Sequence, residues 1–315
     1  MSDLKVFVFF SFVLISMGGR AFASQIDVAR EAVRTKDYAH AIDIAKEEVR
    51  VNHSSEAYNI LGGMYLLGLG VQPSRNQAIN YYVQAAQGGN VSAQATLGAV
   101  YLQNPSSKED IEQARKWLSK AADNGSASAL YNMGLIYEQG LTQQKDFDKA
   151  VANFRKASDL GYVLAKVKLG SLYQSGLVKP EKEGEAVILF QEAAELGSPT
   201  GAFLLGKSYA AGDGTSKSLQ MAARWYLVAA QRGIPLAQAN IASMYEQGIG
   251  VGADALAAYK WYWLASKSMP NVVPRLEALR AHLSPEDVKK TDELKKVWLN
   301  EIDKSVETVS LTIGK

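Results

Sequence analysis

The sequence predicts an all-α protein, a right-handed α-solenoid of stacked antiparallel helix hairpins. One observation is a repeat: a Leu-Gly dipeptide or a close variant recurs at a fixed 36-residue step in six registers, from Leu61-Gly62 to Ile241-Ala242. The other is composition, since 47% hydrophobic residues and 8 prolines among 315 residues are typical of a chain that folds throughout. We therefore expect about six 36-residue repeats between N- and C-terminal capping helices.

Residues 1–23 are typical of a cleavable signal peptide. Lys5 precedes an apolar run, 6–17, that is short for a membrane span, and Ala21 and Ala23 suit the narrow pockets of a signal peptidase. We expect cleavage between Ala23 and Ser24, and a periplasmic or secreted protein with no integral membrane segment after cleavage. The alternative is an N-terminal segment that is retained as an uncleaved anchor.

Residues 24–53 come next and predict an irregular, tetratricopeptide-like helix pair that caps the first repeat. Its apolar positions include Tyr38, Ala41, Ile42 and Ala45. Because a stacked hairpin buries its apolar face only against a neighbour, the first repeat needs such a cap.

Each repeat within 54–270 predicts two antiparallel helices. In the first repeat Ala57, Leu61, Gly62 and Tyr65 fall on one helical stripe. Glycine inside a helix costs about 1 kcal/mol relative to alanine, so its recurrence predicts a close approach by the second helix at a small residue such as Ala78. Further glycines recur where each helix should end: Gly68, Gly140, Gly176, Gly212 and Gly248 for the first helices, and Gly89, Gly125, Gly161, Gly197 and Gly233 for the second.

Residues 271–315 predict a C-terminal cap and a tail. Two charged helices are expected between Asn271 and Ile302, split at Ser284-Pro285, where serine caps and proline occupies the first turn. A loose tail is expected after about residue 303.

The pattern A-x3-L-G-x2-Y-x2-G followed by A-x2-W-Y-x3-A-A-x2-G resembles the Sel1-like repeat, a relative of the tetratricopeptide repeat, over about 54–270. The departures are local: Ala242 replaces the helix glycine, Gly201 the leading alanine, and Asn104-Pro105 the first loop glycine. The resemblance implies an exported bacterial adaptor that scaffolds envelope assemblies, regulates sensors or neutralises toxins. Cysteine-rich members of the family are linked to β-lactam binding, but this chain has no cysteine.

Charge and residue types argue against several function classes. With 34 basic and 32 acidic residues, the chain has a formal charge of +2 and no excess positive field for nucleic acid or anionic lipid. The histidines, His40, His53 and His282, stand far apart in the sequence. We therefore predict no enzyme activity, no catalytic residues, no metal site and no cofactor.

By analogy with tetratricopeptide arrays, the first helix of each repeat lines the concave face. We count from the first residue of each Leu-Gly dipeptide or its variant, such as Leu61. Positions −5, −2, +2, +5 and +6 point outward and hold few charged residues. A face with many amides and two rings suits a polypeptide partner, although small residues there could instead only permit tight curvature. The predicted partner-binding residues are Asn59, Gln103, Tyr131, Glu138, Gln139, Gln174, Phe203, Lys207, Glu246 and Gln247.

Trp263 has two interpretations. Its equivalents in three repeats, Ser119, Arg155 and Gln191, are polar, so this tryptophan either packs under the terminal helices or anchors a partner.

Together these features predict a non-enzymatic periplasmic or secreted adaptor that binds a protein or peptide partner and is a monomer or weak oligomer. Two alternatives remain: an immunity or regulatory protein for an envelope toxin or sensor, and a cell-wall or β-lactam-directed hydrolase.

Overall fold

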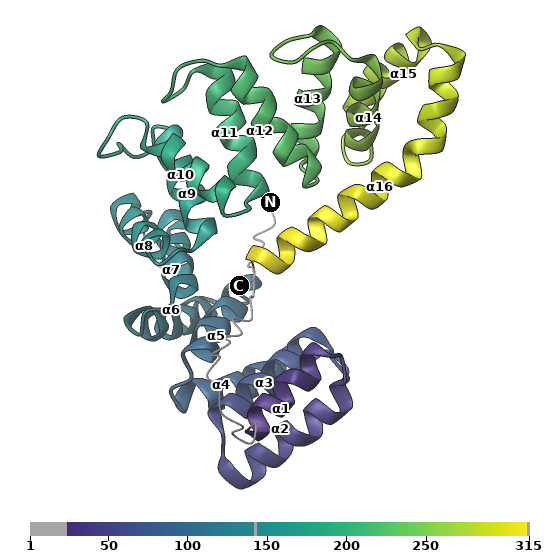
Figure 1. The fold of residues 1–315 in the computed structure, drawn as a ribbon. Coiled ribbons are helices and arrows are strands. Elements are labelled where there is room, and N and C mark those ends of the chain that lie inside the picture. Colours follow the sequence, from purple (N-terminus) through teal and green to yellow (C-terminus); the bar gives the residue numbers. More distant parts are fainter. Residues whose placement is uncertain (1–23, 142–143, 314–315) are drawn as a thin grey trace, which may run out of the picture. The chain divides into compact units, whose positions relative to one another are not determined.

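The computed structural model describes residues 24–141 and 144–313 (Figure 1). In this part of the chain all regular structure is helical. The expected signal peptide, 1–23, lies outside the described residues. The contacts divide the chain into two compact units, unit 1 ending at Tyr162 and unit 2 beginning at Val163.

Unit 1 contains four helix pairs. Each pair is a hairpin, and the second helix of one pair packs on the first helix of the next. The N-terminal pair occupies the segment in which a capping pair is expected. The helices are α1 (Gln25–Arg34), α2 (Tyr38–Asn52), α3 (Ser55–Leu67), α4 (Arg75–Gln87), α5 (Val91–Gln103), α6 (Lys108–Asp123), α7 (Ala127–Gln139) and α8 (Phe147–Asp159).

Unit 2 continues the same pattern and ends in the C-terminal helices. Its hairpins pair α9 with α10, α11 with α12 and α13 with α14. The elements are α9 (Val163–Gln174), α10 (Glu185–Glu195), α11 (Pro199–Ala211), α12 (Leu219–Gln231), α13 (Pro235–Gln247), α14 (Ala255–Ser266), the 3-10 helix η1 (Pro270–Val272), α15 (Val273–His282) and α16 (Pro285–Ile313). The predicted all-α solenoid of stacked hairpins is confirmed.

Local capping explains where the repeat helices begin and end. The hydroxyl of Ser126 accepts a hydrogen bond from the backbone N–H of Ala129 at the start of α7, and Gly140 ends that helix with a φ of 67°. All ten glycines expected to end helices have a positive φ. A side chain at these positions would strain the backbone, so the glycines fix the length of each helix.

In five of the six repeats, a glycine inside the first helix meets a large side chain of the second helix. A Cβ built on Gly62 would lie 2.8 Å from the ring of Tyr82, and one built on Gly98 would lie 2.5 Å from Leu118. The expected close approach is therefore confirmed, but the side chain that lies over the glycine is a large one and not the expected alanine. The large residue lies four positions after that alanine, one helical turn further along the same face.

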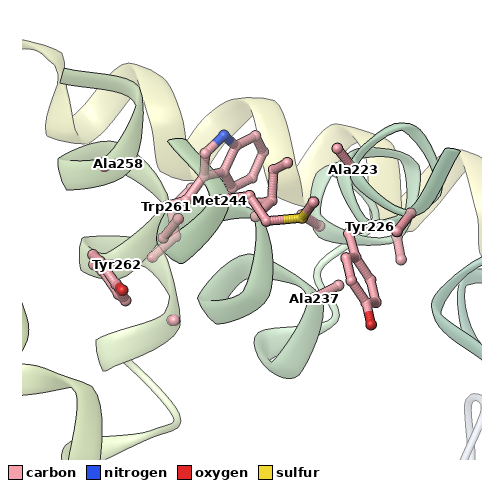
Figure 2. Packing of buried hydrophobic residues seen from close by; sticks show 14 of the residues in the cluster. Ala223, Tyr226, Ala237, Met244, Ala258, Trp261 and Tyr262 are labelled. Atoms are coloured by element: carbon pink, nitrogen blue, oxygen red, sulfur yellow. The ribbon is translucent and has the colours of Figure 1, made fainter. Parts of the chain in front are cut away.

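Buried side chains of unit 2 form one continuous core across its later hairpins. Figure 2 shows part of this core, where the side chains of α12, α13 and α14 converge. Its labelled members are Ala223, Tyr226, Ala237, Met244, Ala258, Trp261 and Tyr262. Successive hairpins thus share one core, as stacking requires.

The C-terminal helices differ from the prediction in length. The split at Ser284-Pro285 is confirmed, and the Ser284 hydroxyl accepts a hydrogen bond from the backbone N–H of Asp287. The expectation of a loose tail after 303 is wrong, because α16 continues to Ile313. After Pro285 no proline or glycine interrupts the chain before Gly314, which allows the helix to continue.

Candidate functional site

The predicted partner-binding residues of unit 1 lie on α3, α5 and α7, but they differ in exposure. Gln103 and Gln139 are exposed at the last positions of α5 and α7. Tyr131 and Glu138 are half-buried, and Asn59 is only 5% exposed. In this unit the two glutamines are therefore the predicted residues most open to a partner.

Tyr131 supports its own hairpin. Its ring centroid lies 5.5 Å from that of Phe154 and 5.3 Å from that of Tyr162. Burial raises the pKa of Tyr131 to about 12, and it also raises the pKa of Tyr162. The Tyr131 ring is therefore a component of the packing beneath the first-helix face.

The predicted residues of unit 2 are largely engaged within the chain. The Gln174 amide donates a hydrogen bond of 2.9 Å to the buried Ser208 hydroxyl. The ring of Phe203 lies 5.9 Å from that of Tyr226. The Gln247 amide donates to the Ser243 hydroxyl but stays exposed, as does Lys207. Gln247 and Lys207 are thus the more accessible positions.

Two carboxylates on the first helices are neutralised internally. Glu56 lies 2.7 Å from the Arg30 guanidinium and also accepts a hydrogen bond from the Asn90 side chain. Glu246 accepts hydrogen bonds from the Tyr262 hydroxyl and the Arg275 guanidinium. These contacts reduce the net charge that the first-helix surfaces present.

Trp263 is buried under the terminal helix. It is 9% exposed, its ring centroid lies 6.0 Å from that of Trp298 on α16, and the Lys267 ammonium stands 4.2 Å from its centroid. This arrangement matches the packing interpretation. A buried ring that α16 covers offers little surface to a partner.

The structure adds a feature that the sequence reasoning missed. A cavity of about 100 Å³ opens in unit 1 between α1, α3 and Ser92 of α5, and Asn59 and Gly63 line it. One sequence signal was Gly63, because the other repeats carry larger residues at this register: Ala99, Leu135, Ser171, Lys207 and Ser243.

The three histidines lie at the surface of the described chain. His40, His53 and His282 are all exposed. Across 24–141 and 144–313 no group of three or more histidines and carboxylates lies close enough to hold a metal ion. Within those same ranges no helix has the length and apolar character needed to span a bilayer.

The comparisons with known proteins found solved structures that resemble this chain. A Sel1 repeat protein from Oxalobacter formigenes is 28% identical, with a TM-score of 0.70 over 78% of this chain and 100% of that one. A protective antigen of uropathogenic Escherichia coli strains, with an SLR fold, is 23% identical, with a TM-score of 0.49 over 91% of this chain and 70% of that one. No curated protein matches the chain significantly.

The Sel1 repeat model matches six consecutive segments, 55–90, 91–126, 127–162, 163–198, 199–234 and 235–268. Each segment contains one helix pair. In order, the pairs are α3–α4, α5–α6, α7–α8, α9–α10, α11–α12 and α13–α14. Because these segments cover more than half of the chain and each holds one hairpin, the chain belongs to the Sel1 repeat family.

Proposed function

We propose that this Sel1 repeat scaffold is a non-enzymatic adaptor that works in the periplasm or outside the cell and binds a protein partner through its first-helix surfaces. The observation that carries the proposal is chemical. Exposed residues on these surfaces are mainly amides and aliphatic groups, among them Gln103, Gln139, Leu67 and Leu236. Amides exchange hydrogen bonds with a polypeptide backbone, and exposed leucines add apolar contact.

Charge supports a polypeptide partner over a polyanion. A nucleic acid site needs several cations that contact phosphates. On the predicted face Lys207 is the one cationic residue, while Glu56 and Glu246 are paired with arginines from α1 and α15. A nearly neutral surface therefore favours recognition by shape and backbone hydrogen bonds.

The location rests on the sequence of residues 1–23. Ser24, the first residue after the expected cleavage site, is the N-cap of α1, and its hydroxyl accepts a hydrogen bond from the Asp27 backbone N–H. Cleavage at that site would leave the cap and every described helix intact, which is compatible with export of a folded adaptor.

The decisive experiment places charges at the two exposed helix ends of unit 1. A double variant, Gln103→Glu with Gln139→Glu, should lower partner recovery from an envelope extract about tenfold, because each new carboxylate must be desolvated at the interface. Quantitative mass spectrometry of the captured proteins measures the loss, and circular dichroism checks that the helices remain.

A matched control uses Gln87→Glu with Gln231→Glu. These glutamines are also exposed and also end their helices, but they lie on the second helices α4 and α12. The control should retain the partner. If both pairs retain it, the partner binds elsewhere and the assignment to the first-helix surface is wrong.

The identity of the captured protein separates the remaining alternatives. An envelope toxin or sensor that is released only by the first-helix variant would make this adaptor an immunity or regulatory protein. Turnover of a β-lactam or of cell wall by the purified chain that is lost when the three histidines and the clustered acids are replaced would contradict the non-enzymatic assignment, whereas turnover that survives those replacements would indicate a contaminating enzyme.

A further inference from the structure

The cavity in unit 1 has mostly apolar walls. Val33 of α1, Ile60, Met64 and Leu67 of α3, and Leu69 of the following loop surround a volume of about 100 Å³. Ile60 and Met64 are buried, whereas Leu67 is 53% exposed at the wall. An engineered cavity of about 150 Å³ with similar walls holds a benzene ring, so this smaller one suits a branched aliphatic group.

Glycine at position 63 distinguishes the first repeat. In the third repeat the same register holds Leu135, which is only 8% exposed. A side chain of that size on Gly63 would occupy the space into which the cavity extends. The glycine also costs about 1 kcal/mol of helix propensity relative to alanine.

Asn59 lines the same cavity with an unpaired amide oxygen. The residue is 5% exposed, and its Oδ1 is buried without a hydrogen-bond partner among the described residues. An unsatisfied buried polar group costs about 1–3 kcal/mol. The equivalent residues carry no carboxamide: Ala95, Tyr131, Val167, Phe203 and Ala239. A carboxamide can accept from a peptide N–H and donate to a peptide carbonyl, so it matches the backbone of an extended segment.

The polar rim of the cavity is already neutralised. Arg30 and Glu56 both line the cavity, and their side chains pair at 2.7 Å. The second carboxylate oxygen of Glu56 accepts from the Asn90 amide at 2.7 Å. A charged ligand group would therefore find no spare counter-charge here, whereas an uncharged side chain loses nothing by entering.

We propose that this cavity binds one aliphatic side chain of an extended partner segment while the Asn59 carboxamide hydrogen-bonds the peptide group beside it. The inference rests on the proposed adaptor function and names the chemistry of its partner. Recognition of a backbone segment through one buried side chain and a paired amide gives specificity for leucine-like residues over charged ones.

The test uses a minimal probe in place of the unknown partner. N-acetyl-leucine N-methylamide carries one aliphatic side chain between two peptide groups. Added to purified protein with labelled methyl groups, it should cause saturable shifts at Ile60, Met64 and Leu69, with a millimolar dissociation constant. N-acetyl-glutamate N-methylamide should bind at least tenfold more weakly.

Two variants separate recognition from folding. Asn59→Leu removes the unpaired amide at similar volume and should abolish probe binding while the melting temperature stays equal or rises. Gly63→Leu fills the cavity and should do the same. Ser171→Leu, at the register of Gly63 but in α9 of unit 2, is the matched control and should leave probe binding unchanged.

The outcomes distinguish this inference from the adaptor function. Equal shifts with leucine and glutamate probes, or no saturable shift, would overturn the cavity assignment. Concentration-dependent shifts at these methyls without a probe would assign the cavity to a second copy of the chain and overturn it as well. If Asn59→Leu loses the probe but keeps the captured partner, the cavity binds aliphatic groups without serving that partner. Loss of both supports the inference in full.

Discussion

Gly134 of α7 lies directly beneath the ring of Phe154 of α8, so that a Cβ on Gly134 would stand 2.5 Å from the Phe154 Cε1 atom. In the other repeats that carry the helix glycine, a large side chain of the second helix lies over it: a ring in three of them and Leu118 in the second repeat. In the sixth repeat Ala242 occupies this register, and Tyr262 stands where Phe154 does in the third repeat. The space above the glycine therefore sets how closely the two helices of a hairpin can pack.

Gly134→Ala should destabilise unit 1. Alanine gains about 1 kcal/mol of helix propensity, but overpacking against a fixed ring costs about 1–3 kcal/mol, and the Phe154 ring has no flexible end that can yield. Urea unfolding followed by circular dichroism should show a lower midpoint. As a control, Ala242→Gly should lower stability through the propensity difference and the loss of a fully buried methyl group.

A double-mutant cycle locates the cause of that effect. Replacing Phe154 by Ala in the Gly134→Ala background should make the glycine substitution neutral or favourable, because the clash disappears. If Gly134→Ala is as harmful without the ring as with it, the clash is not the reason for the glycine.

Trp298 should be a major source of stability for the C-terminal end. It is 7% exposed and packs against Trp263, so Trp298→Ala should cost about 3–5 kcal/mol. Leu299→Ala is the matched control, since Leu299 is its neighbour on α16 and is 39% exposed. Equal unfolding midpoints for the two variants would contradict the assignment of Trp298 to the core.

Stability of the α15–α16 junction should fall in acid. The Arg280 guanidinium, followed by Lys295, holds the pKa of the Asp292 carboxyl well below its usual range. Because the folded pKa lies below the unfolded value of about 3.9, the contribution is present above about pH 4 and is lost as the pH falls toward the folded pKa.

Melting temperatures check this linkage. Asp292→Asn should lower the melting temperature at neutral pH, and the difference from the original protein should narrow as the pH drops below about 4. The effect should be modest, since the pair is exposed to solvent. A difference that stays constant with pH would mean that Asp292 acts through something other than its charge.

The exported protein should begin at Ser24. Expression with the native N-terminus in a bacterium, followed by intact-mass measurement of the periplasmic fraction, should give a chain that lacks residues 1–23. Ala23→Asp should block the cut, because a charged residue does not fit the small pocket. A mature chain that retains Met1 would instead support the uncleaved anchor.

The candidate site was only partly predictable. The exposed Gln103 and Gln139 follow from their register alone, because a position on a regular helix fixes the direction of its side chain. Tyr131, Phe203 and Gln174 share that predicted face, yet each contacts a residue more than twenty positions away in the chain. The two ring contacts lie between the helices of one hairpin, and the Gln174 contact joins neighbouring hairpins. Both kinds depend on how helices pack, which the helical register of a residue does not specify.

The sequence by itself determined the repeat, the two helices of each hairpin and most helix ends, because these depend on periodicity, capping residues and positive-φ glycines, all of which act within a few residues. Only the tertiary structure decided three features. Large side chains of the second helices fill the space over the first-helix glycines, α16 covers Trp263, and the unit 1 cavity lined by Asn59 stays open. Those features depend on which side chains from different helices meet and on how well their volumes fill the space between the helices. Residues far apart in the sequence make these contacts, so local sequence patterns do not specify them.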